Sequence, residues 1–148
     1  MSDGVRIHKL EPDYVSKRWD TLGYFIQQAL EKSENPFAGG NLLKAIQTGK
    51  LECWAVMKIK GEVADMIGVV TTKVGGDQIL GTRDLVLYSV TAIRRLNLDD
   101  FLAGVKQFEE VARGLGCSGL VSYVRDRQLA EMAERIGFQT KHVVRKEL

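Results

Sequence analysis

The turn between an apolar strand and a long amphipathic helix is the segment best placed for chemistry. The strand ends at Val90, the helix begins near Leu98, and the residues between them include Arg94 and Arg95. Free backbone N–H groups and the positive dipole at the start of a helix attract phosphate, and glycine there allows close approach of the ligand. Phosphate binding is therefore the chemistry to consider at this turn.

The residues of this turn differ from those of a usual phosphate-binding loop. No glycine occurs between Val90 and Phe101. Asn97 or Asp99 would cap the helix with its own side chain and occupy the N–H groups that a phosphate needs. A carboxylate about 5 Å from a phosphate charge costs about 1 kcal/mol in water and about 3 kcal/mol at an effective dielectric near 20. Asp99 and Asp100 therefore disfavour phosphate binding of the usual kind.

The two arginines of the turn offer another anchor for a phosphate. A guanidinium group forms paired hydrogen bonds with phosphate oxygens, so Arg94 and Arg95 could hold phosphates with side chains in place of backbone amides. The other interpretation is a solvated strand end with no ligand. Both interpretations stay open on the sequence.

Cysteine and histidine are too few and too scattered to form a metal centre. Cys53 and Cys117 lie far apart within apolar stretches, which predicts reduced, buried thiols and no disulfide. His8 and His142 lie near opposite ends of the sequence, and no Cys/His cluster has the spacing of metal ligands. We expect no bound metal.

Length, composition and charge are those of an ordinary globular protein. The chain has 148 residues, of which 45% are apolar and 27% charged, and this predicts one domain over residues 1–148. A net charge of +2 is too small for the positive field that nonspecific nucleic-acid binding requires. We expect neither a secretion signal nor a membrane span, and hence a cytoplasmic protein.

Basic residues near the C-terminus leave one weaker alternative, which is contact with nucleic acid. Glutamates among them dilute the positive charge, so a solvated surface is the simpler interpretation. The basic residues are Arg125, Arg127, Lys141, His142, Arg145 and Lys146, and the glutamates are Glu131, Glu134 and Glu147.

The first third of the chain has the pattern of a strand followed by two helices. A short strand is expected over Val5–Leu10. Apolar residues at steps of three and four then predict one helix over Tyr14–Lys32. A brief helix over Leu42–Thr48 follows, with Asn41 as its cap and Gly49 as its stop.

The middle of the chain has the pattern of an antiparallel meander. Leu51–Ile59 and Met66–Val74 are rich in β-branched residues and are separated by a Lys-Gly-Glu turn. A Gly-Gly-Asp turn then leads to a returning strand, which we expect to run through Ile79 and Leu80 and to continue as Leu85–Val90.

The last third alternates helix and strand. The pattern predicts a helix over Leu98–Leu115, a strand over Leu120–Val124, a helix over Arg127–Ile136 and a strand over Thr140–Val144. A strand-helix-strand unit at this point implies one parallel pairing in an otherwise antiparallel sheet.

This order of elements resembles the GNAT family, the acyl-CoA-dependent N-acetyltransferases. Two short sequences add to the likeness: Ala-Arg-Gly-Leu-Gly-Cys at residues 112–117, which leads into a strand, and Met-Ala-Glu-Arg-Ile-Gly-Phe at residues 132–138. The second is similar to the family's helix ending in Leu-Tyr-x-Lys-x-Gly-Phe. The resemblance spans nearly the whole chain and implies an α+β fold, with a mostly antiparallel mixed sheet and helices on both faces.

The resemblance also implies a cofactor site. In the family, the pyrophosphate of acyl-CoA rests on a loop of the form Gln/Arg-x-x-Gly-x-Gly/Ala at the start of the long helix, and the matching span here is residues 94–101. Acetyl-CoA or another acyl-CoA would then contact Val90, Arg94, Arg95 and Asn97. The glycines of the family loop are missing from this span.

An enzyme of this family further needs an acid for the leaving thiolate and a base for the amine. The register of the late helix puts Ala133 at the position of the family's tyrosine. Tyr88 and Tyr123 lie on the two strands that splay apart in the family, so either could line the cleft or act as the acid, and core packing is the alternative. The candidate bases, each of which could be an ordinary charge at a strand end, are Asp84, Glu52 and Glu62.

Two functions remain open. The missing glycine loop and tyrosine favour a divergent GNAT-fold protein with weak or no standard acetyl-CoA-dependent activity. It would act as a binding or assembly module with a protein partner or a second copy of itself. Such a protein would be similar to GNAT-like proteins of bacteriophages, found in the host cytoplasm or the virion. The alternative is an acyl-CoA-dependent N-acyltransferase that moves an acyl group to a small amine.

Overall fold

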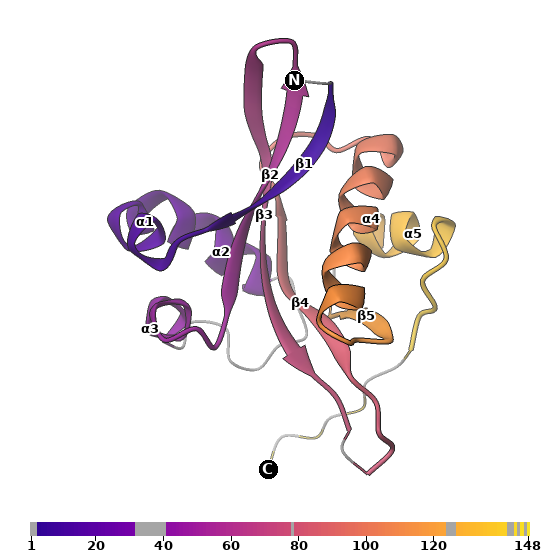
Figure 1. Ribbon diagram of the computed structural model, residues 1–148. Helices are drawn as coiled ribbons and strands as arrows, with labels where there is room; N and C mark the ends of the chain where they lie inside the picture. Colours follow the sequence, from indigo (N-terminus) through magenta and orange to yellow (C-terminus); the bar gives the residue numbers. More distant parts are fainter. Residues whose placement is uncertain are drawn as a thin grey trace.

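A five-stranded sheet lies between two groups of helices in the computed structural model (Figure 1). The structure describes residues 3–31, 41–77, 79–123, 127–141, 144, 146 and 148. The strands are β1 (Gly4–Leu10), β2 (Glu52–Lys60), β3 (Val63–Gly75), β4 (Asp84–Ala92) and β5 (Gly119–Ser122). The helices are α1 (Pro12–Lys17), α2 (Trp19–Glu31), α3 (Leu42–Gln47), α4 (Leu98–Gly114) and α5 (Arg127–Arg135). The predicted α+β class, with helices on both faces of the sheet, is confirmed.

The strands form one mixed sheet in which a single pair is parallel. Their order is β1-β2-β3-β4-β5, and β1 to β4 are antiparallel neighbours. β5 pairs in parallel with β4, from Asp84 opposite Gly119 to Leu87 opposite Ser122. A parallel neighbour needs a crossover connection, and α4 supplies it. The predicted parallel pairing is therefore present.

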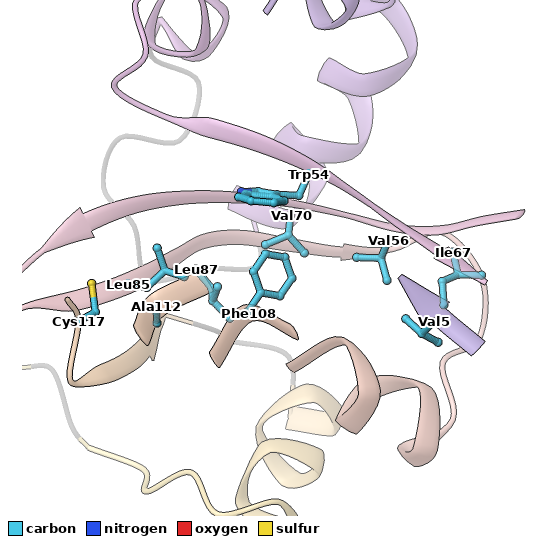
Figure 2. Close-up of a cluster of buried hydrophobic side chains, with 10 residues drawn as sticks. All are labelled: Val5, Trp54, Val56, Ile67, Val70, Leu85, Leu87, Phe108, Ala112 and Cys117. Carbon is cyan, nitrogen blue, oxygen red and sulfur yellow. The ribbon is translucent and has the colours of Figure 1, made fainter. Parts of the chain in front are cut away.

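Each face of the sheet carries its own hydrophobic core. Helices α1, α2 and α3 cover one face, where the buried residues are Val15, Leu22, Ile26, Leu42, Ile46, Leu51, Cys53, Val69 and Tyr88. Helix α4 covers the other face, and Figure 2 shows its core residues Val5, Trp54, Val56, Ile67, Val70, Leu85, Leu87, Phe108, Ala112 and Cys117. Trp54 meets Phe108 edge to face, with ring centroids 5.6 Å apart. The two cores fix α2 and α4 on opposite faces of the sheet.

Helix α4 begins and ends as its sequence predicts. The Asp100 N–H donates to Oδ1 of Asn97 at 2.8 Å, which is a side-chain cap. After the helix, Gly116 has φ +75°, the left-handed conformation that favours glycine at a helix end. In the described part of the chain, neither α4 nor another helix combines the length and apolar composition that a membrane crossing needs.

The outer edge of the sheet at β1 is covered by a side chain of α4. The Ile7 N–H donates to Oε1 of Gln107 at 2.8 Å, and Nε2 of Gln107 donates to the Val5 carbonyl. An exposed strand edge otherwise offers unpaired backbone groups to other chains. Gln107 therefore replaces a neighbouring strand for two backbone groups of β1.

The single helix predicted over Tyr14–Lys32 is wrong, because the chain forms two helices that meet at Arg18. Arg18 has φ −116° and ψ 23°, which lies outside the helical range. Hydrophobic spacing does not reveal this break, since Val15 of α1 and Leu22 of α2 are buried in the same core. Lys32 itself lies outside the described residues.

The expectation that a strand runs through Ile79 and Leu80 is also wrong. Oδ1 of Asp77 accepts the N–H groups of Ile79 at 2.9 Å and Leu80 at 3.2 Å, and the Thr82 N–H donates to the Asp77 carbonyl at 3.0 Å. This hydrogen-bonded turn leaves the Ile79 and Leu80 side chains 95% and 75% exposed. β4 accordingly begins at Asp84.

Two smaller expectations need correction near the ends of the helices. Asn41 precedes α3, but its side chain makes no capping hydrogen bond. The described residues of the last predicted strand, Thr140–Val144, belong to no strand. The Thr140 hydroxyl instead donates to Oε1 of Glu134, which ties this segment to α5. Predicted residues that lie outside the described part of the chain are Val124, Arg125, His142, Val143, Arg145 and Glu147.

Candidate functional site

The site begins where β4 leaves β5. In the part of the chain that the structure describes, pairing between the two strands ends at Leu87 and Ser122. The next residue, Tyr88, is an extra residue in the ladder with β3, because Leu87 pairs with Thr72 while Ser89 pairs with Thr71. An extra residue of this kind bends a strand and increases its twist. The bulge therefore accounts for the separation of β4 from β5 beyond this point.

Two cavities meet at this separation. The first, about 370 Å³, lies between α4 and α5 over strands β3 and β4. The second, about 880 Å³, lies between α2, α5 and the end of β4. Because α2 and α4 cover opposite faces, the residues shared by the two cavities lie between the two sides of the sheet. Residues that line both cavities are Val90, Thr91, Ala92, Leu96, Tyr123, Leu129 and Glu134.

The first cavity is lined mainly by apolar side chains. Its floor includes Ile67 and Val70 of β3, and its α4 wall includes Gly104 and Phe108. Val70 and Phe108 face one another from the sheet and the helix (Figure 2). Charged lining residues come from the first turn of α4, from α5 and from the segment after it, and they are Asp100, Glu134 and Lys141. Such a lining suits a mostly apolar ligand with a polar end.

The second cavity is more polar. Arg94 and Arg95 line it from the turn after β4. Nη1 of Arg94 lies 3.2 Å from Oδ2 of Asp65 on β3, in an exposed ion pair. Arg95 is exposed and has no ion pair with another described residue. From α2 and α5, the polar and charged lining residues are Gln28, Gln128, Glu131, Glu134 and Arg135.

The two aspartates at the start of α4 differ in their surroundings. Oδ2 of Asp100 lies 2.8 Å from Nζ of Lys58 on β2 in a partly buried ion pair, whereas Asp99 is exposed. The charge of Asp100 is thus neutralised by a residue distant in sequence. The repulsion expected from two free carboxylates is therefore reduced to that of Asp99.

The structure brings together some of the residues singled out from the sequence. Val90 and Tyr123 line both cavities, and Tyr123 is 39% exposed. Arg94 and Arg95 line the second cavity, and Asn97 caps α4 beside them. These five residues lie around the gap between β4 and β5 and the turn that follows it.

Other candidates lie away from the gap. Tyr88 is 6% exposed in the core beneath α2, with Nζ of Lys73 5.2 Å from its ring centroid. Asp84 lies at the far end of β4, opposite Gly119. Glu52 forms an ion pair with Lys9 at 2.9 Å, and Glu62 lies in the exposed β2–β3 turn. None of these four residues lines either cavity.

Two lining residues were not recognised in the sequence. Glu134 of α5 lines both cavities and follows Ala133, the position where the family's tyrosine was expected. Gly104 lies buried in the middle of α4 and lines the first cavity. A glycine on the apolar face of a long helix was the available signal, since glycine weakens a helix interior.

Cysteine supplies no reactive group at this site. Burial raises the pKa of the Cys53 thiol to about 11, although a hydrogen bond with the Trp54 backbone acts in the opposite direction. A thiol with this pKa stays protonated at neutral pH, and the thiolate is the nucleophilic form. Among the described residues, His, Cys, Asp and Glu form no group suited to a metal ion.

Comparison with known proteins identifies the fold. No protein-family model and no curated protein matches the sequence. Solved structures do match, including an aminoglycoside acetyltransferase from an uncultured soil metagenomic sample, in complex with sisomicin. It has a TM-score of 0.67 and 11% identity, with 97% of this chain and 95% of that chain covered. The chain has a GNAT-like fold.

Two further structures support this GNAT-like fold. Ribosomal-protein-alanine N-acetyltransferase from Brucella melitensis biovar Abortus 2308 matches with a TM-score of 0.62 and 15% identity, covering 97% of this chain and 100% of that chain. Aminoglycoside N-acetyltransferase AAC(6')-Iy in complex with CoA matches with a TM-score of 0.62 and 13% identity, covering 100% of this chain and 97% of that chain. At such low identity the likeness concerns the fold alone.

Proposed function

We propose that the chain is an acyl-CoA-dependent N-acyltransferase. The observation that carries this proposal is the meeting of two cavities, from opposite faces of the sheet, in the gap between β4 and β5. A donor that enters from the α4 side and an acceptor that enters from the α2 side could meet there. A module whose cleft had been filled would lack these two cavities, so their presence favours the transferase over the binding or assembly module.

The edge of β4 from Ser89 to Ala92 suits the pantetheine arm of CoA. Among the described residues, the pairing of β4 with β5 ends at Leu87. Backbone groups along such an edge need hydrogen-bond partners, and an extended ligand with amide groups can supply them as an added strand would. Val90 and Ala92 border both cavities and belong to this stretch. The pantetheine amides would lie along it, with the thioester in the gap.

Side chains in place of a glycine loop would hold the phosphates. Arg95 has no ion pair with another described residue, and Arg94 has only an exposed one. Lys58 neutralises Asp100, which removes part of the negative charge at the start of α4. Guanidinium groups bind phosphate through paired hydrogen bonds. Arg94 and Arg95, with Asn97 capping the helix, therefore form the proposed diphosphate site.

The reaction needs two proton transfers at the gap. The amine nitrogen attacks the thioester carbonyl carbon, the new C–N bond forms, and the C–S bond breaks with loss of a thiolate. Tyr123, partly exposed where the cavities meet, would give its hydroxyl proton to the thiolate. Glu134 is the described carboxylate that lines both cavities, and it would take the proton from the amine. Tyr88 and Asp84 are not part of this proposal.

Binding of acetyl-CoA tests the proposal. A ligand at one hundred times its dissociation constant stabilises the folded protein by about 2.7 kcal/mol, which is a rise of about 5–10 °C in melting temperature for a domain of this size. Calorimetric titration and transfer of radiolabelled acyl groups to small amines would follow. If acetyl-CoA and longer acyl-CoAs at millimolar concentration leave the melting temperature unchanged, the proposal is wrong. Self-association by size-exclusion chromatography would then test the module.

A further inference from the structure

The extra residue in β4 places two successive side chains on the same face of the sheet. Tyr88 is buried in the core beneath α2. Ser89 pairs with Thr71, and Thr71 pairs with Cys53, which belongs to the same core. Directly paired residues on neighbouring strands project on the same face of a sheet. Ser89 therefore faces the α2 side, where the second cavity lies, and it lines that cavity.

The Ser89 hydroxyl is held by a second buried hydroxyl. Oγ of Ser89 and Oγ1 of Thr71 lie 2.6 Å apart, and the two residues are 3% and 0% exposed. Among the described residues, neither hydroxyl forms another hydrogen bond. Burial of two hydroxyl groups costs free energy that their hydrogen bond only offsets, so an apolar pair of the same shape would serve the core equally well. Folding alone therefore does not explain this pair.

The direction of this hydrogen bond decides which hydroxyl proton is free. If Ser89 donated, the proton of the Thr71 hydroxyl would have no acceptor among the described residues, although Thr71 is fully buried. A buried donor without a partner is strongly unfavourable. If Thr71 donates instead, the free proton belongs to Ser89 and faces the second cavity, where water or a ligand can accept it. The surroundings therefore favour Thr71 as the donor and Ser89 as the acceptor.

Other hydroxyl groups beside the gap use their protons within the fold. Oγ1 of Thr91, on the same face of β4, donates to the Phe25 carbonyl of α2 at 2.8 Å. Oγ of Ser122, at the end of β5, donates to the Leu87 carbonyl at 3.2 Å. Both hydrogen bonds join one element of the fold to another. Ser89 differs from these two residues, because its proton has no acceptor among the described residues.

We propose that the Ser89 hydroxyl donates a hydrogen bond to an oxygen atom of the acceptor, and that the acceptor is an amine with this oxygen close to its nitrogen, as in a 1,2-amino alcohol. The inference rests on the acyltransferase function proposed above and names a feature of its acceptor. Ser89 precedes Val90, which lines both cavities. An oxygen bound to Ser89 therefore lies next to the place where the amine must reach the thioester.

Two contacts would then orient the acceptor. Ser89 on the sheet binds its oxygen, and Glu134 of α5 takes the proton from its nitrogen, and both residues line the second cavity. Fixing the orientation of a reacting group is a large part of catalysis. Thr71 does not line the second cavity and is a positioning residue, because its hydrogen bond holds the Ser89 hydroxyl in one orientation.

Acyl transfer from acetyl-CoA to 2-aminoethanol and to propylamine tests this inference on the full chain. The two amines have nearly the same size, and comparing the ratio of their kcat/KM values between variants cancels their different reactivity. Ser89→Ala should lower the preference for 2-aminoethanol at least about tenfold, because the hydroxyl that binds the oxygen is gone. Thr71→Val leaves the Ser89 hydroxyl free to rotate and should lower the preference severalfold. Thr71→Ser keeps the positioning hydroxyl and should keep the wild-type preference.

Thr72→Val is the matched control on the other face of the sheet. Thr72 is 1% exposed, and its hydroxyl accepts from Nε1 of Trp54 at 2.9 Å. This variant should melt at a lower temperature and keep the wild-type preference. Ser89→Ala should also melt a few degrees lower, because the Thr71 proton loses its acceptor. The double variant Ser89→Ala/Thr71→Val lacks both hydroxyls and should recover most of this loss.

The outcomes separate the role of Ser89 from the function on which it rests. If Ser89→Ala keeps the wild-type ratio, whether or not both rates fall, the inference is overturned and the acyltransferase stands. If acetyl-CoA binds but neither amine is acylated, the acceptor is of another class and the inference is likewise overturned. Failure of every acyl-CoA to bind overturns the acyltransferase proposal together with it. If Ser89→Ala does not fold, the double variant replaces it and should show the same loss of preference.

Discussion

The two halves of β4 have different neighbours. We call Asp84–Leu87 the closed half, which contributes to stability, and Ser89–Ala92 the open half, which borders the proposed binding site. From Asp84 to Leu87 the strand is paired on both edges, with β3 and β5, and Leu85 and Leu87 are buried beneath α4. From Ser89 to Ala92 its neighbour among the described residues is β3, and cavities lie on both of its faces. One extra residue, Tyr88, lies between the halves.

A single extra residue in β4 is associated with the end of its pairing with β5. If β4 stayed paired with β5 beyond Leu87, the gap between the two strands would be closed, and the sheet would separate the two cavities. The bulge bends β4 away, while ladder pairing on the β3 side resumes at once with Ser89 opposite Thr71. Thr71 and Ser89 also share a buried side-chain hydrogen bond of 2.6 Å. The open half of β4 is therefore stabilised by its pairing with β3.

The largest expected effect tests whether the closed half of β4 contributes more to the free energy of unfolding than the open half does. Leu85 is 1% exposed, and truncation of a leucine in such a position costs about 2–5 kcal/mol. We expect Leu85→Ala to lower the free energy of unfolding by about 3 kcal/mol in urea denaturation. Val90→Ala, in the open half, should cost about 1 kcal/mol or less because Val90 faces the cavities. Equal losses in the two variants would contradict the division of β4.

The next effect concerns Tyr88 and Tyr123, the two tyrosines that the sequence offers as the acid. Tyr123→Phe should lower kcat about a hundredfold, as loss of a general acid does, with little change in melting temperature. Tyr88→Phe should keep kcat and lower the free energy of unfolding by about 1 kcal/mol, because Tyr88 is buried in the core beneath α2. Steady-state kinetics and urea denaturation of both variants measure this. A slow Tyr88→Phe enzyme with an unaltered Tyr123→Phe enzyme would reverse the assignment.

Much of the fold follows from local patterns. Helical and strand periodicity predicts β2, β3, α4 and α5 to within a few residues, and Asn97 and Gly116 mark the ends of α4. Features that depend on a local hydrogen bond are harder to see. The carboxylate of Asp77, for example, turns the chain before Ile79 and leaves two apolar residues exposed.

The site is less predictable because it depends on contacts between distant residues. Alternation along β4 and β5 cannot separate Tyr88 from Tyr123, since the extra residue that directs Tyr88 into the core is defined only by its pairing with β3. The charge of Asp100 is likewise cancelled by Lys58, which is 42 positions away. An estimate from the residues of the turn alone therefore overstates how strongly the carboxylates of Asp99 and Asp100 repel a phosphate.

The edge of the sheet at β1 differs from the open half of β4, because a side chain of α4 covers it. Gln107 accepts from the Ile7 N–H and donates to the Val5 carbonyl on β1, whereas the pairing of β4 with β5, as far as the described residues go, ends at Leu87. We expect Gln107→Leu to lower the free energy of unfolding by about 2 kcal/mol, because the Ile7 N–H loses its partner and the Val5 carbonyl keeps its bond from Nη1 of Arg6 but loses the one from Gln107. Gln107→Glu can still accept from Ile7 and should cost about half as much. Unfolding curves without this order would show that the amide does not seal the edge.

The smallest effect distinguishes the arginines beside the open half. Arg95 has no ion pair with another described residue, while Arg94 already faces Asp65. An exposed ion pair contributes little to stability but competes with an incoming phosphate for the guanidinium group. We therefore expect Arg95→Ala to weaken CoA binding about tenfold and Arg94→Ala about threefold, as free energies of roughly 1.4 and 0.7 kcal/mol. Calorimetric titration at two salt concentrations measures both, and the wild-type affinity should fall more steeply with salt than that of Arg95→Ala because an arginine–phosphate contact is screened. Should both variants bind CoA as wild type does, the diphosphate does not lie at this turn, and the open half of β4 would bind the donor by its pantetheine and acyl parts alone.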